Sequence, residues 1–197
     1  ITHYKIFLAS PGGLEEERDE YYDIVNEYSQ DILRFKNVKF DPCGYEETLA
    51  EYINTQEAIN TQFLENCDYF ILLIWDRIGT LTESGKSRTE LEYMMAVNLL
   101  SDTEKPMHDI VVFSKEIEEN KLRDEKDRRQ LDRAKDFIKR LIEKEKGLIK
   151  PFNDLRSFRR LVTQHLTKWV CDHDSKYKEE PERISVMNIE DGTKPTK

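Results

Sequence analysis

Two glutamates stand close together in the segment Ser87-Arg-Thr-Glu-Leu-Glu-Tyr-Met-Met-Ala96, and one of them is a candidate acid for catalysis. On a helix, Glu90 and Glu92 point about 200° apart, so they cannot both face one cleft. Glu90 follows Ser87 at the spacing of a capping box, which assigns it to the helix N-terminus. Glu92 is then the carboxylate available to a substrate, able to bind ribose hydroxyls or to stabilise an oxocarbenium-like centre. The alternative is that Glu92 is an ordinary surface carboxylate.

A glycine-rich turn, Ser10-Pro11-Gly12-Gly13, follows an apolar run and precedes a helical pattern. Glycines at a helix N-terminus expose backbone N–H donors, which suits a phosphate or a ribose hydroxyl. They also serve simply to make the turn, and the acids at 15–17 already occupy the favourable end of the helix dipole. Arg18 either neutralises those acids or reaches into the cleft. Both alternatives stay open from the sequence.

A second loop, Gly79-Thr-Leu-Thr-Glu-Ser-Gly-Lys-Ser87, is similar to a phosphate-binding P-loop, because it lies between an expected strand and an expected helix and ends in Gly-Lys-Ser. Five residues separate its glycines, whereas a P-loop has about four, and the extra residue spoils the cradle of N–H groups. Glu83 would also repel an anion. We therefore do not expect an ATPase.

These loops need elements that bring them together, and apolar runs and amphipathic periodicity predict alternating strands and helices. Residues 68–75 are apolar on both faces, which is typical of a central parallel strand, whereas Asp41-Pro42 favours a sheet edge for 38–45. In the charged segment 115–146 we expect the first half to project and the second to pack, either as a solvated helix or as a partner-binding arm. The expected strands are 4–9, 38–45, 68–75, 109–113 and 148–152, and the expected helices are 14–35, 55–65, 87–100, 115–146 and 154–170.

Alternation of this kind predicts an α/β fold with a mostly parallel sheet wrapped by right-handed crossovers. Such sheets bind ligands beyond the carboxyl ends of their strands, where the strand order reverses. Three loops are expected to converge there: Ser10 to Gly13, Cys43 to Glu47, and Trp75 to Ser87.

The composition limits the classes of function. A chain of 197 residues with 38% hydrophobic residues suits one domain, which we place at 1–174, followed by a polar linker or tail at 175–197. Because the chain opens at Ile1, we expect it to be part of a longer protein. A net charge of -9 argues against nucleic acid as a partner. No apolar run reaches the roughly 18 residues of a membrane span and no signal peptide is present, so we expect a soluble, cytoplasmic protein.

The cysteines give no sign of a metal centre. Cys43, Cys67 and Cys171 lie far apart in the sequence, without a C-x-x-C pair or a histidine at ligand spacing. We therefore expect reduced thiols and no bound metal.

Three segments, Ile6 to Arg18, Phe70 to Gly79 and Ser87 to Ala96, resemble the TIR-like domain of unknown function found at the N-termini of STAND NTPases and prokaryotic defence proteins. The resemblance covers most of residues 3–171. It implies a flavodoxin-like fold with a central five-stranded sheet. In TIR domains and nucleoside deoxyribosyltransferases, a helical glutamate followed four residues later by alanine is the catalytic acid, which here matches Glu92 and Ala96.

The resemblance implies an effector or signalling domain in antiviral defence that cleaves the nicotinamide–ribose bond of NAD, with NAD as substrate and no cofactor. Activation would come from self-association or from further domains of a longer protein. Two alternatives remain: a protein–protein interaction module without chemistry, and an enzyme of free nucleosides. Beside the catalytic Glu92, the expected substrate-binding residues are Ser10, Pro11, Gly12, Gly13, Arg18, Tyr45, Trp75, Asp76, Arg77, Gly79, Ser87 and Thr89.

Overall fold

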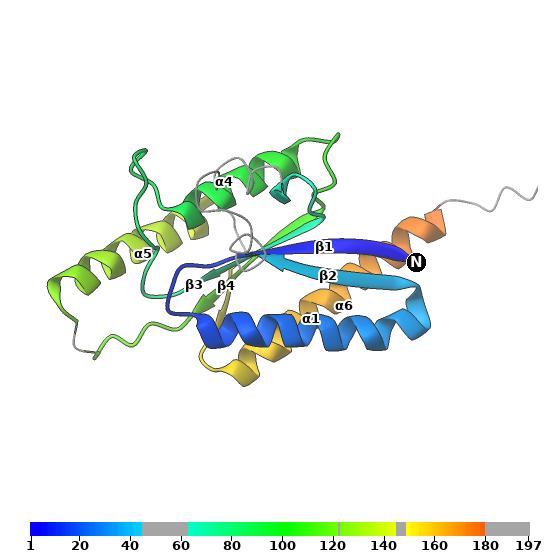
Figure 1. The fold of residues 1–197 in the computed structure, drawn as a ribbon, viewed down its shortest axis with the longest axis horizontal. Helices are drawn as coiled ribbons and strands as arrows, with labels where there is room; N and C mark the ends of the chain where they lie inside the picture. The colour runs from blue at the N-terminus through cyan, green and yellow to red at the C-terminus, as the bar shows by residue number, and fades with distance from the viewer. Residues whose placement is uncertain (45–62, 122, 145–148, 180–197) are drawn as a thin grey trace, which may run out of the picture.

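The computed structural model describes residues 1–44, 63–121, 123–144 and 149–179, where strands and helices alternate along the chain (Figure 1). Tyr45 and most of the helix expected over 55–65 lie outside the described residues. In chain order the elements are β1 (Thr2–Ala9), α1 (Glu15–Lys36), β2 (Val38–Gly44), β3 (Tyr69–Ile74), α4 (Arg88–Ser101), β4 (Asp109–Lys115), α5 (Glu125–Lys144), β5 (Ile149–Phe152) and α6 (Leu155–Glu179).

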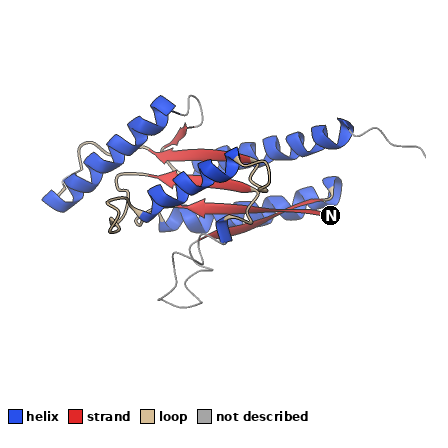
Figure 2. Ribbon diagram, turned by 90° about the horizontal axis from the view of Figure 1, so that it is seen from above, coloured by secondary structure: helices blue, strands red, loops and turns tan. Residues whose placement is uncertain are grey.

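The five strands of the described chain form one parallel sheet in the order β2-β1-β3-β4-β5 (Figure 2). The expected α/β, flavodoxin-like arrangement of three layers is therefore confirmed. β3 lies at the centre and is buried along its whole length, as its uninterrupted apolar run predicts. β2, which contains Pro42, lies at an edge of the sheet, where a missing backbone N–H is tolerated.

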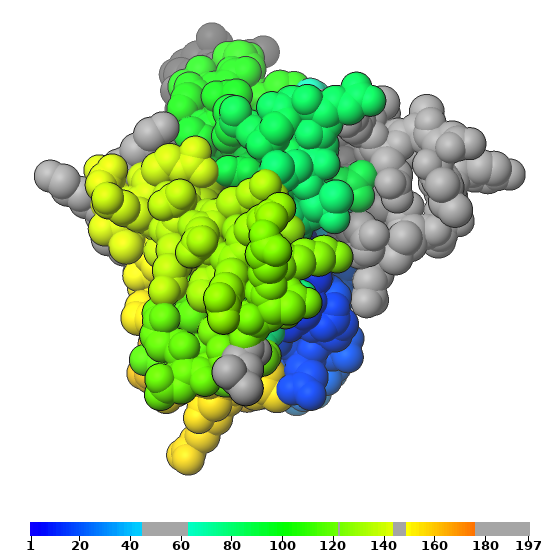
Figure 3. All heavy atoms as spheres, turned by 90° about the vertical axis from the view of Figure 1, so that its left-hand side faces the viewer, coloured from blue at the N-terminus to red at the C-terminus, as the bar shows by residue number. Residues whose placement is uncertain are grey.

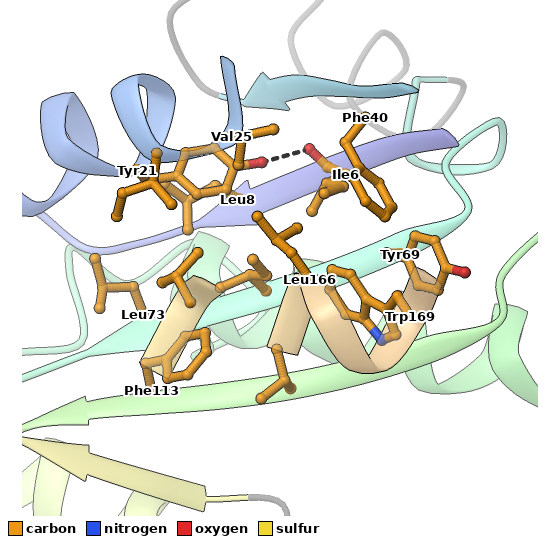
Figure 4. Close-up of a cluster of buried hydrophobic side chains, with 14 of the residues drawn as sticks. Ile6, Leu8, Tyr21, Val25, Phe40, Tyr69, Leu73, Phe113, Leu166 and Trp169 are labelled. Atoms are coloured by element: carbon orange, nitrogen blue, oxygen red, sulfur yellow. Dashed lines mark hydrogen bonds between the residues drawn. The ribbon is translucent and has the colours of Figure 1, made fainter. Parts of the chain in front are cut away.

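One apolar core lies between the sheet and the helix pair α1 and α6 (Figure 4). The rings of Tyr69 on β3 and Trp169 on α6 stack with their centroids 4.1 Å apart. The hydroxyl of Tyr21 on α1 donates to the carbonyl oxygen of Ile6 on β1 at 2.8 Å. This layer fixes the directions of β1 and β3 and therefore the positions of the loops that leave them.

A second core lies on the opposite face, under α4 and α5. Phe70, Leu72 and Ile74 of β3 belong to this core, whereas Tyr69, Ile71 and Leu73 belong to the first one. The alternation follows from the two-residue period of a strand. Trp75, directly after β3, continues the alternation and belongs to the first core.

The segment expected as a helix over 115–146 differs from the expectation in its first part. β4 continues to Lys115 and α5 begins only at Glu125. The second half of α5 packs against the sheet as expected, through Phe137 and Leu141, whereas Ile142 near its end is 57% exposed. α6 is longer than expected and continues to Glu179, so the boundary placed at 174 lies inside this helix.

Two expectations from composition concern the thiols and the membrane. The three cysteines are free, and the Sγ atoms of the buried Cys43 and Cys67 lie 3.5 Å apart, although these residues are distant in the sequence. Within the described ranges, none of the helices combines the length and the apolar character that a bilayer crossing demands.

Candidate functional site

A pocket of about 430 Å³ lies where the strand order reverses, beside the loops that follow β1 and β3. β1 connects through α1 to one side of the sheet, while β3 leads to the other, so the two loops leave a gap between them. Figure 3 looks onto this edge of the molecule, where the blue segment of β1 and α1 borders the green segments that follow β3. We call this the switch-point pocket. Its walls are the turn at Ser10, Pro11 and Gly12, the loop at Ile78, Gly79 and Thr80, and the start of α4 at Arg88, Thr89 and Glu92.

The first wall is a turn that Arg18 holds in shape. Its Nη1 donates to Ser10 Oγ at 3.1 Å and to the carbonyl oxygen of Pro11 at 3.2 Å. Its Nη2 donates to Glu15 Oε1 at 2.9 Å, and the same carboxylate oxygen accepts from the Gly13 N–H at 3.0 Å. That backbone hydrogen bond is the main reason why the pKa of Glu15 lies below its usual value. Arg18 therefore both compensates the negative charge of Glu15 and holds the turn at Ser10 and Pro11 in place.

The second wall is a loop that α5 supports. Gln130 donates from Nε2 to the carbonyl oxygen of Gly79 at 3.1 Å and accepts from the Ile78 N–H, with 3.3 Å between the nitrogen and Oε1. Gly79 has φ of +96°, a left-handed conformation that favours glycine. A single amide side chain thus holds two peptide groups of the loop, Arg77–Ile78 and Gly79–Thr80. Sequence reasoning missed Gln130, because nothing in a charged helix marks one amide as a support for a distant loop.

The third wall is the first turn of α4, which the expected capping box positions. Ser87 Oγ accepts from the Glu90 N–H at 3.1 Å, and Glu90 Oε2 accepts from the Ser87 N–H at 2.9 Å. Arg140 of α5 donates to the other oxygen of Glu90 at 2.9 Å. With Glu90 committed to the cap, Glu92 lines the pocket together with the buried Thr89. The capping role of Glu90 is as the spacing predicts.

The environment of Glu92 raises its pKa from 4.5 to about 7. The cause is burial, which disfavours the charged carboxylate, while the nearby charge of Arg88 opposes the shift. A carboxyl with this pKa populates both protonation states near neutral pH, as an acid–base group requires. Sequence reasoning missed Arg88 as a pocket residue, although its position four residues before Glu92 places both side chains on one face of the helix.

Trp75 lies elsewhere than expected. Its side chain belongs to the core under α1 and α6, on the other side of the sheet from α4. The indole Nε1 donates to the carbonyl oxygen of Glu116 at 3.2 Å. The Nζ atoms of Lys115 and Lys121 lie 4.5 and 5.1 Å from the ring centroid. Trp75 therefore packs against the segment that follows β4 and does not line the switch-point pocket.

Asp76 and Arg77 also stay outside the pocket lining. Asp76 is buried, accepts from Arg77 Nε at 3.1 Å and lies 3.7 Å from Arg123 Nη2. The Arg77 side chain packs against Gly13, where a Cβ would lie 3.4 Å from Arg77 Nε. Through the contact of Arg77 with Gly13, the loop after β3 packs against the turn after β1 outside the pocket. Ser87, likewise expected at the substrate, is fully buried and occupied by its capping bonds.

A larger pocket of about 1130 Å³ adjoins the first, and we call it the outer pocket. Thr80, Arg88 and Glu92 line both pockets, so these residues form the boundary between them. The remaining wall of the outer pocket is largely apolar, with Leu64, Leu81, Leu91 and Met95. Throughout the part of the chain that the structure describes, no cluster of His, Cys, Asp and Glu is arranged to hold a metal ion.

A parallel five-stranded sheet with helices on both faces and a pocket at the switch point defines an α/β protein of the flavodoxin-like class. Residues 5–167 match the family described as a domain of unknown function, DUF4062, and the chain belongs to this family. A search of curated proteins found no match. The matched range includes all three walls of the switch-point pocket.

Proposed function

We propose that this chain is a TIR-like effector domain that cleaves the nicotinamide–ribose bond of NAD. The observation that carries the proposal is the position of Glu92, which lines the switch-point pocket and whose carboxyl has a pKa of about 7. The same pocket contains Ser10 and Gly12, which offer a hydroxyl and a backbone N–H to the substrate. A pocket of about 430 Å³ lies within the range of small-ligand sites.

The proposed reaction breaks the bond between the ribose C1′ and the nicotinamide ring nitrogen. The bonding electron pair leaves with the ring, which departs as neutral nicotinamide, and an oxocarbenium-like ribose remains. The ionised carboxylate of Glu92 stabilises this cation and accepts hydrogen bonds from the ribose hydroxyls. Water then attacks C1′ and loses a proton to Glu92 or to solvent, which gives ADP-ribose.

The first experiment clusters the chain on vesicles and follows NAD by chromatography. Clustering is included because TIR-like enzymes are expected to be switched on by self-association. We expect nicotinamide and ADP-ribose to accumulate, and Glu92→Gln to lower the rate roughly 100-fold or more, since a positioned acid–base group contributes about that much. The matched control is Glu104→Gln, which changes an exposed carboxylate just beyond the same helix.

The same assay separates the alternatives. NAD and NADP that stay intact for hours with clustered protein would contradict the proposal and favour an interaction module. Turnover of free nucleosides with intact NAD would favour a nucleoside hydrolase or transferase. A role in antiviral defence, and a position at the N-terminus of a STAND-type protein, are proposals that rest on the resemblance of the three sequence segments alone.

A further inference from the structure

We infer that the outer pocket binds the adenosine half of a dinucleotide, so that the site selects NAD over nicotinamide mononucleotide. This inference rests on the proposed function and adds a statement about which part of the substrate occupies which space. Its basis is that the two pockets share Thr80, Arg88 and Glu92 and therefore meet at the expected point of bond cleavage.

The wall that the two pockets share has groups that can bind the ribose and pyrophosphate in the middle of a dinucleotide. Glu92 lies in both pockets. We place the nicotinamide side of a ribose bound there in the smaller switch-point pocket, which leaves the phosphate side facing the larger outer pocket. Arg88 lies on the same wall and close enough to affect the pKa of Glu92. A guanidinium presents a planar fork of donors that matches phosphate oxygens. We therefore assign Arg88 to the pyrophosphate.

The outer pocket has groups that can bind the purine ring and the ribose of the adenosine half. Leu81, Leu91 and Met95 supply an apolar wall for a purine ring, and the thioether of Met95 adapts well to an aromatic face. Besides Glu92, the described lining of the outer pocket contains the carboxylate of Glu83. A carboxylate accepts hydrogen bonds from a ribose diol, so Glu83 suits the adenosine ribose. A mononucleotide would leave this apolar surface exposed to water.

The test measures binding to the 197-residue chain carrying Glu92→Gln, which keeps the substrates intact. Calorimetry compares NAD, nicotinamide mononucleotide and nicotinamide riboside. We expect NAD to bind at least about tenfold more tightly than the mononucleotide, because the purine buries apolar surface. Adding Arg88→Gln is expected to weaken NAD and the mononucleotide by roughly tenfold and the riboside little, since only the first two carry phosphate.

A pair of methionine variants tests the position of the purine. Met95→Trp fills the outer pocket and is expected to reduce NAD binding by roughly tenfold while binding of the mononucleotide is unchanged. Met94→Trp places the same ring on the neighbouring exposed surface of α4 and is expected to change neither. Thermal unfolding of both variants shows whether they fold alike.

Equal affinities for NAD and the mononucleotide, or equal losses for both in Met95→Trp, would overturn the inference. If the clustered wild-type chain cleaves both substrates with the same kcat/KM, the inference fails while the proposed function stands. If NAD binds selectively and Met95→Trp abolishes the selectivity, but clustered protein leaves NAD intact, the inference stands and the proposed function fails. Absence of binding by all three compounds overturns the inference, whereas the proposed function is decided by the cleavage of NAD in the clustered assay.

Discussion

At the scale of single residues, Glu92 carries an electrostatic cost that the fold tolerates. Burial raises its pKa from 4.5 to about 7, so the folded protein holds this proton more tightly than the unfolded chain does. Between these two pKa values the unfolded state binds fewer protons, and stability therefore falls as the pH rises. Above about 7 the whole cost of the partly buried carboxylate is present. A stability cost of this kind is common where a site is built for chemistry.

The neutral variant Glu92→Gln should remove that cost. We expect it to raise the free energy of unfolding by about 2–3 kcal/mol at pH 8 and by less than about 1 kcal/mol at pH 5, since one pKa unit corresponds to about 1.4 kcal/mol. Urea denaturation at both pH values measures the difference, with Glu104→Gln as the exposed control. A gain of equal size at the two pH values would show that the carboxyl of Glu92 titrates normally.

At the scale of elements, the switch-point pocket depends on a helix, α5, that does not itself line it. Gln130 of α5 accepts a hydrogen bond from the N–H of Ile78 and donates one to the carbonyl oxygen of Gly79. Gln130→Leu keeps a similar volume and removes both bonds. We expect NAD cleavage to fall roughly tenfold, as for a loss of one to two hydrogen bonds, while unfolding changes by only about 1 kcal/mol.

The control for this element is Asp132→Asn, which changes an exposed residue of α5 near Gln130. The split between activity and stability is the informative readout, because it separates a loop support from a general packing residue. If Gln130→Leu cleaves NAD at the wild-type rate, the loop after β3 does not need its support from α5.

The elements also show where sequence reasoning works and where it stops. β3 and the capping box of α4 were predictable, because an apolar run of strand length and the Ser87–Glu90 spacing each have one favoured structure. The position of Trp75 was not, because β3 is apolar on both faces and its sequence does not show which residues face α4. A shift of one residue in the alternation moves a side chain to the other side of the sheet.

The charged stretch after β4 shows a second limit. A run of charged residues with high helix propensity predicts a helix from Lys115. The backbone groups directly after β4 instead form hydrogen bonds with distant residues. Glu116 donates its N–H to Phe152 O at 2.8 Å and accepts from Trp75 Nε1 at 3.2 Å. These partners come from distant parts of the chain, and tertiary contacts of this kind override local propensity. The pocket wall at Ile78 and Gly79, which Gln130 supports, depends on a similar long-range contact.

At the scale of the whole molecule, the core under α1 and α6 holds the sheet in place for the pocket at the ends of β1 and β3. Trp169 is fully buried and stacks on Tyr69, and its Nε1 donates to Asp109 at 2.9 Å. We expect Trp169→Ala to lower the free energy of unfolding by about 3–5 kcal/mol, as is usual for loss of a buried large aromatic ring. Phe35→Ala, at a ring that is 79% exposed, should change it by less than about 0.5 kcal/mol.

Urea denaturation followed by circular dichroism measures both variants. Comparable stabilities for Trp169→Ala and the wild-type chain would mean that α6 is not packed on the sheet as described. The whole-molecule account predicts instead that loss of this ring lowers the stability of both layers together, because a single domain of this size unfolds cooperatively.

The central claim is that the carboxyl of Glu92 performs glycosidic cleavage at the switch point of the sheet. The most direct measurement is nicotinamide release from NAD by the clustered chain as a function of pH. We expect the rate to rise with pH through about 7 as the Glu92 carboxylate forms, and to fall roughly 100-fold or more in Glu92→Gln. Release by Glu92→Gln at the wild-type rate, or no release by the wild-type chain at any pH, would contradict the account.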